Sequence, residues 1–514
     1  MLKLIKKLIK IGLLTPRGAF YFASALVSEG VNLMALARFA ARRQNQKIAF
    51  SDEREEISYA NLYERVEYLA AILRNKYHLK TKQKVAFLCR SHIAFVLGIF
   101  AVSRLGTNIY LLNPESSAEQ FAALNQRHRF DFLIYDSENV VFDVSEWRGK
   151  SISSYQTPDT TIDSIETLAK QKTEFQTKIK RAVSGELIVL TGGTTGEPKT
   201  ARRKPSVFTF LNPFFALLTR LNLDIYQSVY IATPLYHGFG IATMIIGLIL
   251  GEKTFLLARF DAEKACTLIK ANEIQAVTVV PLMLQRMLKR DAAALNSLKL
   301  IISGGAALNP SLVEETFEKL GDKLFNLYGT SEAGFSVIAT PEDLRRLPET
   351  IGRKIGGVKL SVLDAKNNEV PTGKIGRICI KSKWSVKTSD AWVETGDTGF
   401  QDADGYLFLR GRNDEMIVSG GENVYPIELE NALIRHPSIE QVAVIGVPDA
   451  EFGQRLKAFV VSAAENVLSE REILDWLSGK VARFQMPKSV EIIKELPVTA
   501  VGKINKKALS KLSN

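Results

Sequence analysis

The chain has 514 residues, of which 46% are hydrophobic and 24% charged, and it carries a net charge of +12. This balance indicates an ordered globular protein with several hydrophobic cores and excludes a disordered chain. The positive charge favours an anionic partner, such as anionic lipid, nucleotide or nucleic acid, without choosing among them.

The first fourteen residues predict a basic amphipathic helix. At about 100° per residue, its lysines share one arc and its leucines and isoleucines share the opposite arc. The lysines are Lys3, Lys6, Lys7 and Lys10. Three interpretations stay open: contact with an anionic membrane surface, docking on the protein's own core, or a partner helix. A secretory signal peptide is not expected, because Lys10 interrupts the apolar run and Pro16 and Arg17 follow it.

The cysteines and the apolar stretches point to the cytoplasm. The three cysteines are widely spaced in apolar runs, so we expect buried thiols in a reducing compartment. The apolar stretch 239–251 contains glycines and is shorter than the roughly 20 residues that a membrane span needs. We therefore expect a cytoplasmic protein without a transmembrane helix, whose N-terminal helix contacts the inner face of a membrane if the lipid interpretation holds.

From about residue 48 onward, short β-rich runs alternate with amphipathic helices. A strand at 84–89, a helix at 92–105 and a strand at 107–112 form a βαβ unit, and the alternation returns between 228 and 303. The pattern predicts a large layered α/β domain. Strands broken by turns around 360–381, continuing through 405–411, predict an antiparallel β subdomain.

A compact α+β segment of ordinary domain size follows Asp414. The charged stretch Arg412 to Asp414 is flanked by glycines and is consistent with a hinge. We divide the chain into a basic N-terminal region at 1–44, an α/β domain at 45–412 and a small mobile α+β domain at 413–514.

Two widely separated segments predict phosphate chemistry. Thr191-Gly-Gly-Thr-Thr-Gly-Glu-Pro-Lys199 follows the apolar strand 186–190, and such a turn can present N–H groups and hydroxyls to phosphate oxygens. It is not a Walker loop, because Glu-Pro and not Lys-Ser/Thr follows Gly196. Near the chain end, Lys503 could supply a removable positive charge to the same centre. The pair suggests phosphate chemistry in two stages.

The loop TGGTTGEPK resembles the phosphate loop of the adenylate-forming superfamily, and further motifs follow in that family's order. They are Tyr236-His237-Gly-Phe-Gly240, Gly304-Gly-Ala-Ala-Leu308, Asn326-Leu-Tyr-Gly-Thr-Ser-Glu332, Glu394-Thr-Gly-Asp397, Gly411-Arg-Asn-Asp414, Ser419-Gly-Gly-Glu-Asn423 and the Lys503 loop. The resemblance spans about residues 45 to 510 and is closest to bacterial long- and medium-chain fatty-acyl-CoA synthetases, notably in 417–430. Thr200 departs from the family pattern, which usually has glycine after the lysine.

The resemblance implies ATP, Mg²⁺ and coenzyme A as cofactors and assigns the site residues. The implied catalytic residues are Lys503, Glu332, Thr194 and His237, with Thr194 and Glu332 as oxygen ligands of Mg²⁺. The implied cofactor-binding residues are Thr191, Gly193, Thr195, Gly196, Lys199, Gly305, Ala306, Ala307, Tyr328, Gly329, Thr330, Asp397, Arg412, Asp414, Gly420 and Gly421.

The residue types suit these roles. Tyr328 offers a ring face for adenine, and the small residues at 304–307 let backbone approach it. The resemblance gives the ribose hydroxyls to Asp397 and the ribose or phosphate to Arg412. Two readings of His237 stay open, a core residue or a group that lines the carboxylate and gates the acyl pocket.

The sequence therefore predicts an ATP-dependent fatty acid:CoA ligase for long or medium chains. It would form acyl-adenylate and pyrophosphate, and then acyl-CoA and AMP. No charged residue occurs between Phe239 and Gly251, which favours an aliphatic acid. By resemblance, the domain after Asp414 rotates between the steps, withdrawing Lys503 and presenting 419–425 to coenzyme A.

Several alternatives stay open at this point. The acceptor could be the phosphopantetheine of a carrier protein, or the acid could be aromatic. A catalytically silent nucleotide or lipid binder is disfavoured, because Lys503, Glu332 and Asp397 are all present. We expect no nucleic-acid partner, and a homodimer stays open.

Overall fold

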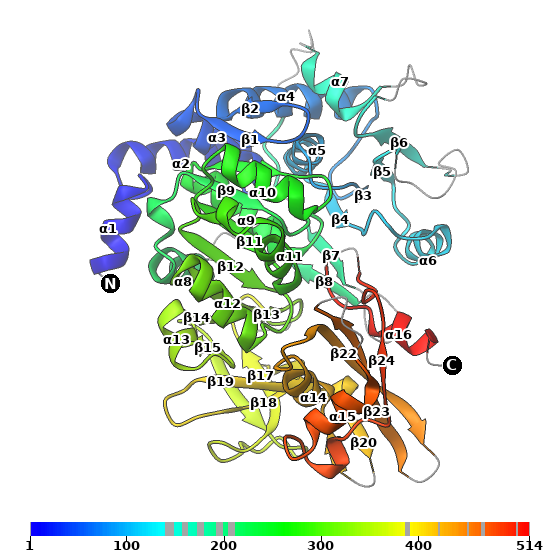
Figure 1. Cartoon of the computed structure of the whole chain (residues 1–514). Helices are drawn as coiled ribbons and strands as arrows, with labels where there is room; N and C mark the ends of the chain where they lie inside the picture. Colours follow the sequence, from blue (N-terminus) through cyan, green and yellow to red (C-terminus); the bar gives the residue numbers. More distant parts are fainter. Residues whose placement is uncertain are drawn as a thin grey trace. The chain divides into compact units, whose positions relative to one another are not determined.

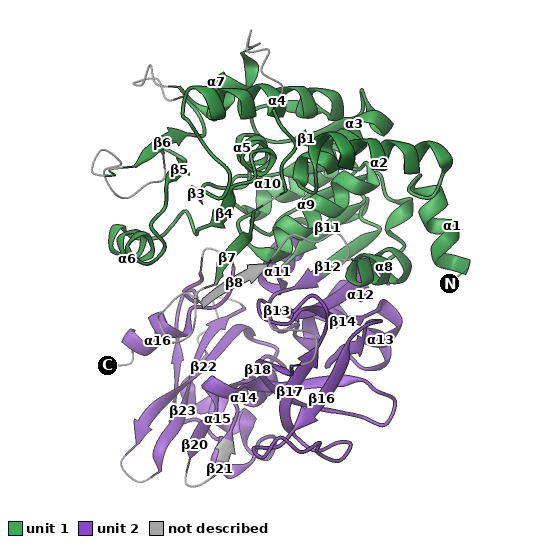
Figure 2. Ribbon diagram, turned by 180° about the vertical axis from the view of Figure 1, so that it is seen from behind, with its two compact units in different colours: residues 1–279, 289–302 green, residues 280–288, 303–514 purple. Residues whose placement is uncertain are grey.

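The computed structural model describes residues 2–138, 147, 149–156, 163–171, 179–183, 185–191, 199–203, 211–385, 391–419, 422–449, 452–463, 468–499 and 502–512. The chain forms two compact units (Figure 2). Unit 1 comprises residues 1–279 and 289–302, and unit 2 comprises residues 280–288 and 303–514.

The first sheet of unit 1 confirms the predicted βαβ pattern. Its strand order is β6-β5-β3-β4-β7-β8, and all neighbours are parallel except β7 and β8 (Figure 1). The strands are β3 (Lys84–Leu88), β4 (Asn108–Leu111), β5 (Phe132–Tyr135), β6 (Lys150–Ser153), β7 (Leu187–Thr191) and β8 (Lys199–Arg203). Helix α5 (Ile93–Arg104) connects β3 to β4 and is buried along its whole length, as its nearly continuous apolar sequence requires.

Unit 1 also contains the neighbouring strands β11-β9-β10-β1-β2 of a larger sheet, and they are parallel except for the β1–β2 pair. These strands are β1 (Ile48–Ser51), β2 (Glu56–Ser58), β9 (Ser228–Ile231), β10 (Lys253–Leu256) and β11 (Ala276–Val279). The other helices of unit 1 are α1 (Leu2–Lys10), α2 (Pro16–Glu29), α3 (Leu33–Gln44), α4 (Tyr59–Asn75), α6 (Ala118–His128), α7 (Ile165–Lys170), α8 (Leu211–Arg220), α9 (Gly238–Leu250) and α10 (Ala262–Ala271), with short 3₁₀ turns η2 (Leu223–Ile225) and η3 (Ala293–Leu295).

Unit 2 contains the predicted antiparallel region. Strands β16-β17-β18-β19-β15-β14-β13 follow one another with antiparallel pairing throughout. Their bounds are β13 (Leu324–Thr330), β14 (Gly334–Ala339), β15 (Thr350–Lys354), β16 (Lys359–Leu363), β17 (Gly376–Lys381), β18 (Val393–Gln401) and β19 (Leu407–Arg412). Helices α12 (Pro310–Leu320) and α13 (Pro341–Arg346) belong to this unit, while β12 (Leu300–Gly304) and α11 (Pro281–Asp291) each have residues in both units.

The C-terminal part of unit 2 is the predicted small α+β structure. Its sheet has the order β21-β20-β23-β22, and β24 pairs with β23 in parallel. The elements are η4 (Asn413–Glu415), β20 (Ile417–Ser419), β21 (Glu422–Val424), α14 (Pro426–Leu433), β22 (Ile439–Asp449), β23 (Gly453–Ser462), α15 (Glu470–Leu477), η5 (Arg483–Gln485), β24 (Ser489–Ile492) and α16 (Lys506–Leu512). Leu429, Val444 and Ile473 are among the fully buried side chains of its core.

Two predictions from composition can be compared with this fold. Cys89, Cys266 and Cys379 are buried free thiols, as their apolar surroundings indicate, and burial raises the pKa of each thiol. Within the described part of the chain, no helix is both long and apolar enough to cross a membrane.

Candidate active site

The centre of the candidate site is Asp397 in β18, a carboxylate held by two donors from other strands. Tyr328 of β13 donates its hydroxyl hydrogen to Oδ2 of Asp397 at 2.6 Å. Arg412, the last residue of β19, donates from Nη1 to Oδ1 at 3.2 Å. Each oxygen keeps a further lone pair, so Asp397 can still accept hydrogen bonds from two hydroxyl groups of a ligand.

The backbone on either side of Asp397 is shaped for these contacts. Gly396 has φ +81°, and a methyl group built on it would lie 2.9 Å from Nη2 of Arg412. Glycine is therefore needed both for the left-handed backbone and for the approach of the guanidinium group. The Oγ1 of Thr395 accepts the N–H of Asp397 at 3.2 Å and donates to the carbonyl of Ile378 at 2.9 Å, which fixes the turn.

Burial dominates the electrostatics of these groups. It raises the pKa of Asp397, and the hydrogen bond from Tyr328 and the charge of Arg412 offset this only in part. Burial and the neighbouring carboxylate raise the pKa of Tyr328 well above its usual value. Burial alone would lower the pKa of Arg412, but Asp397 and Asp414 outweigh this effect and raise it. Tyr328 thus stays a neutral donor and Arg412 a permanent cation.

Lys503 lies in the same unit and close to this centre. A methyl group built on Gly305 would lie 3.9 Å from Cε of Lys503, and one built on Gly502 would lie 3.1 Å from Val280 and 3.3 Å from Met283. The lysine retains solvent contact, yet the surrounding protein and then the charge of Arg412 lower its pKa. Among the described residues no carboxylate pairs with it. Its charge is thus available to an incoming anion.

The segment from Gly305 to Ala307 follows β12 and leaves its three small residues exposed. Gly305 has φ +80°, a conformation that side chains rarely adopt. An exposed strip of backbone without large side chains can lie flat against a planar ring. The 305–307 segment belongs to the unit that also carries Tyr328 and Lys503, and it is available for contact with a purine.

Glu332 lies in the turn between β13 and β14, half-buried, and makes no hydrogen bond or ion pair with any described residue. Thr330 stabilises that turn by accepting the N–H of Ala333 at 3.1 Å. Gly329 is required by the tight hairpin, because an added methyl would meet the carbonyl oxygen of Gly334 at 2.6 Å. A carboxylate held in a hairpin turn, with no ion pair to any residue that the structure describes, is an oxygen ligand of the kind that a hard metal ion prefers.

The remaining predicted residues are in unit 1 or outside the described residues. Thr191 ends β7 and pairs in register with Lys199 at the start of the antiparallel strand β8. The predicted residues Gly193, Thr194, Thr195, Gly196, Gly420 and Gly421 lie outside the described residues. His237 is the residue before α9, half-buried beside the ring of Tyr236 at a centroid distance of 4.7 Å.

One residue that matters to this site was missed in the sequence. Lys506, at the start of α16, pairs with Glu415 at 2.9 Å and with Glu430 at 3.0 Å. Glu430 also accepts the N–H of Val444 at 2.9 Å. These bonds fix the segment that carries Lys503. The sequence shows only that Lys506 follows Lys503 by three positions, and this spacing does not reveal its acidic partners.

A buried acceptor for hydroxyls, a tyrosine ring, two cations and an exposed small-residue strip define a protein that can bind a nucleotide and act on its phosphates. The model of the AMP-binding enzyme family matches residues 36–388, and that of the AMP-binding enzyme C-terminal domain matches residues 428–503. The chain belongs to the AMP-binding enzyme family.

Curated relatives and solved structures agree with this assignment. The chain is 29% identical over 488 residues to indoleacetate--CoA ligase of Aromatoleum aromaticum, covering 90% of this chain and 94% of the relative. It is 31% identical over 346 residues to the fatty acid--[acyl-carrier-protein] ligase ScoC of Streptomyces coeruleorubidus, covering 62% of this chain and 66% of that protein. The crystal structure of ATP-bound MatB from Rhodopseudomonas palustris aligns with a TM-score of 0.80 at 25% identity, over 93% of this chain and 98% of the other.

Proposed function

We propose that the protein is an AMP-forming acid:CoA ligase that uses ATP and Mg²⁺. The observation that carries the proposal is the position of Lys503 beside Gly305, close to Arg412 and Asp397 in one compact unit. Membership of the AMP-binding family and the CoA ligase named for a relative that matches 90% of this chain support it.

In the first step, a carboxylate oxygen of the acid attacks the α-phosphorus of ATP. The P–O bond to the β-phosphate breaks, pyrophosphate leaves with the bonding electrons, and acyl-AMP remains. Two anions must meet for this to happen, and the charge of Lys503 lowers that repulsion. Asp397 accepts from the ribose hydroxyls, Tyr328 lies against adenine and Arg412 donates to the ribose or phosphate. When bound, Mg²⁺ would neutralise phosphate charge, and among the described residues Glu332 would be its ligand.

In the second step, the thiolate of coenzyme A attacks the acyl carbon of the mixed anhydride. The C–O bond to phosphate breaks, AMP leaves and the thiol proton goes to solvent. We propose a hinge at Asp414, an exposed residue of η4, that removes Lys503 for this step. The domain division at residues 412 and 413 and the Mg²⁺ role of Thr194 remain predictions.

For the acid, an aromatic or other compact apolar body is favoured over a long alkyl chain. Indoleacetate, the acid named for the relative that spans most of this chain, is aromatic. Helix α9 supports an apolar acid, because it has no charged residue along its 13 positions. A fatty acid is the second candidate. It is supported by the shorter match to a fatty acid ligase and by the glycines of α9, which can leave room for a chain.

The test is pyrophosphate release across two series of acids, aryl and arylacetic acids against fatty acids of increasing length. Each acid is then offered coenzyme A and a holo-carrier protein as acceptors. Thioester formation on the carrier alone would replace the CoA ligase assignment with carrier loading. Absence of pyrophosphate release with every acid would contradict the proposed reaction.

The Lys503→Ala variant separates the two half-reactions. We expect a loss of acyl-AMP formation of about 10²-fold or more, with thioester formation from added acyl-AMP largely kept. Lys507→Ala is the matched control, because Lys507 is an exposed lysine four residues further on. Equal loss of both half-reactions in Lys503→Ala would show that the lysine does not act in the first step alone.

A further inference from the structure

The N-terminal helix α1 is attached to unit 1 by one side. Leu8 and Ile11 are buried there, and α1 packs on α8. Lys7 and Lys10 both form ion pairs with Asp224 of η2, the second at 2.9 Å. Burial would raise the pKa of Asp224, but the hydrogen bonds from the two lysines outweigh it and lower the pKa. One side of the helix is therefore docked on the protein, which is one of the three interpretations left open by the sequence, and its other side faces away from unit 1.

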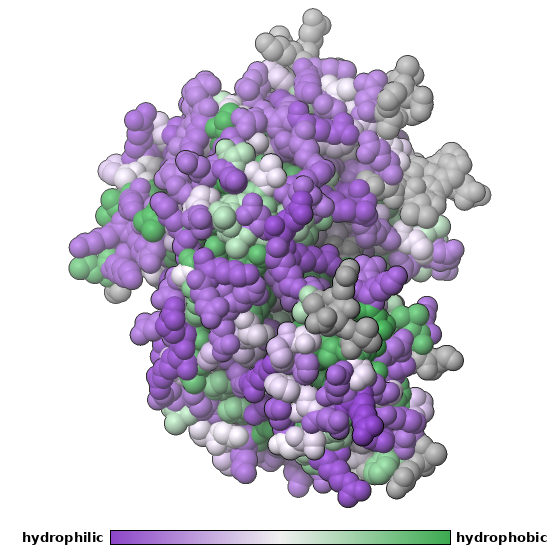
Figure 3. Space-filling model, in the orientation of Figure 1, coloured by the Kyte–Doolittle hydropathy of each residue, from purple (hydrophilic) through white to green (hydrophobic). Residues whose placement is uncertain are grey.

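That other side of α1 combines exposed apolar and basic residues. Leu2 is 68% exposed, Ile5 39% and Ile9 48%, and their spacing of three and four places them on one face. Lys3 and Lys6 are exposed beside them. Figure 3 shows hydrophobic residues interspersed with hydrophilic ones at the left edge, where α1 and α2 lie in Figure 1.

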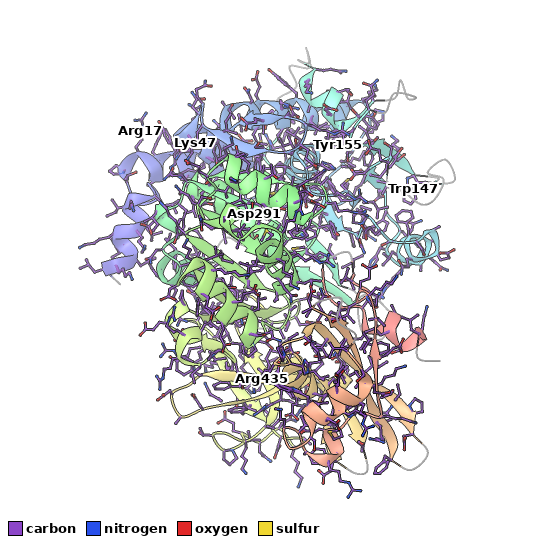
Figure 4. The ribbon with its side chains drawn as sticks, in the orientation of Figure 1. Arg17, Lys47, Trp147, Tyr155, Asp291 and Arg435 are labelled. Carbon is purple, nitrogen blue, oxygen red and sulfur yellow. The ribbon has the colours of Figure 1, made fainter. Side chains whose placement is uncertain are left out.

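Helix α2 continues the apolar surface. Its inner side packs on α3, with Ala25 against Phe39. Apart from Arg17, its exposed residues are apolar, and they recur at helical spacing: Pro16, Ala19, Phe20, Ala23 and Val27. Phe20 and Val27 are 68% and 69% exposed, so no described part of the protein covers them. Arg17 lies on the outer side of this helix (Figure 4).

The N-terminal segment that contains α1 and α2 is strongly basic. Residues 1–50 contain nine lysines and arginines and one acidic residue, a net charge of +8 out of the +12 of the chain. The single acid, Glu29, is 2% exposed and pairs with Arg38 at 2.6 Å. The outer face of α1 and α2 therefore presents apolar side chains and cations without a competing carboxylate of its own.

We propose that the outer face of α1 and α2 binds the surface of an anionic membrane. Its exposed leucine, isoleucines and Phe20 enter the boundary between headgroups and acyl chains, and Lys3, Lys6 and Arg17 bind lipid phosphate. Charge complementarity selects this occupant. A second copy of the chain would bring two faces of the same positive charge together, and repulsion opposes that contact. The inference does not depend on the proposed reaction.

The experiment is flotation of the full-length protein with two kinds of vesicle, phosphatidylcholine alone and equimolar phosphatidylcholine and phosphatidylglycerol. We expect binding to the anionic vesicles only, weakened by added salt. Lys3→Gln with Lys6→Gln should weaken it by about fivefold per lysine. The matched control is Lys270→Gln with Lys299→Gln, which removes the same charge from exposed positions elsewhere in unit 1.

A second pair of variants tests the apolar part. Ile9→Ser and Ile375→Ser remove the same side chain at 48% and 47% exposure, so each removes a similar amount of exposed apolar surface. We expect Ile9→Ser to weaken vesicle binding several-fold and Ile375→Ser to leave it unchanged. Equal binding by the two variants, or no binding of the wild type to anionic vesicles, would overturn the proposal. The proposal would also be overturned if the wild type formed a dimer that did not bind vesicles and if Ile9→Ser dissociated this dimer. The outer face of α1 and α2 would then be an interface between two copies of the chain.

Discussion

Replacing Lys506 by methionine should loosen the segment that carries Lys503 without removing Lys503 itself. Methionine keeps most of the length and the apolar stem of the side chain but not its charge. Glu415 and Glu430, which contact the ammonium at 2.9 and 3.0 Å, would then lose their shared cation. Both carboxylates are partly buried, at 33% and 18% exposure, so water replaces the cation incompletely.

The magnitude follows from the pKa of Lys506. Burial lowers it, but Glu430 and Glu415 outweigh burial and raise it from 10.5 to about 12. At about 1.4 kcal/mol per pKa unit, this rise corresponds to ~2 kcal/mol in favour of the charged, folded form. A lysine with a raised pKa contributes fully below pH 10.5 and loses the contribution as pH rises through 12. From pH 7 to 9 the effect should therefore be constant.

Hydrogen exchange measured by mass spectrometry gives the readout, because it reports local opening in a chain that need not unfold as one unit. If opening frees this ion pair, a loss of ~2 kcal/mol should speed the exchange of the 502–512 amides by about 30-fold. Lys507→Met, at an exposed neighbouring position, should leave them unchanged, and Lys506→Arg should retain part of the protection. Equal exchange in Lys506→Met and the wild type would refute the reasoning, since the ion pairs would then contribute nothing.

Two further predictions concern the Asp397 centre. Gly396→Ala should lower the melting temperature and raise the KM for ATP, because its methyl group would lie 2.9 Å from the guanidinium group of Arg412. The control is Gly373→Ala, where φ is +79° and the space around the residue is open. This variant should show only the backbone strain of about 1 kcal/mol and a normal KM for ATP. Tyr328→Phe removes the 2.6 Å hydrogen bond to Asp397 and keeps the ring. The KM for ATP, measured by pyrophosphate release, should therefore rise by about three- to tenfold. Tyr328→Ala also removes the ring, so its KM for ATP should rise further. A Gly373→Ala variant as impaired as Gly396→Ala, or a Tyr328→Phe variant as impaired as Tyr328→Ala, would contradict these assignments.

The sequence predicts local elements and motifs well, because both depend on neighbouring residues. Alternation of β-rich runs and helices predicted a strand at 84–89, a helix at 92–105 and a strand at 107–112, within one residue of the observed bounds of β3, α5 and β4. The order of motifs predicted a nucleotide site, and the structure places Tyr328, Asp397, Arg412 and Lys503 in one unit. Here an ordered set of short patterns carried more information than composition or net charge.

Contacts between distant segments were not predictable from the sequence alone. Lys506 pairs with Glu430 and Glu415, which lie about 76 and 91 positions away in the sequence. The sequence contains many other lysines and glutamates, and nothing in it shows which of them form pairs. The N-terminal helix shows a related limit. Its periodicity predicted an apolar and a basic side, but packing on α8 buries Leu8 and Lys7 together and leaves Ile9 exposed. Which part of an amphipathic surface is buried depends on the shape of its neighbour.

The burial of all three cysteines makes the chain a favourable host for a spectroscopic label. Cys89, Cys266 and Cys379 are at most 3% exposed, and the raised pKa of each thiol keeps it in the protonated form that alkylating reagents attack slowly. A cysteine introduced at an exposed position should thus react selectively without deletion of the native thiols. Fluorescent reporters on either side of Asp414 could then follow the proposed hinge during turnover in an otherwise unaltered protein.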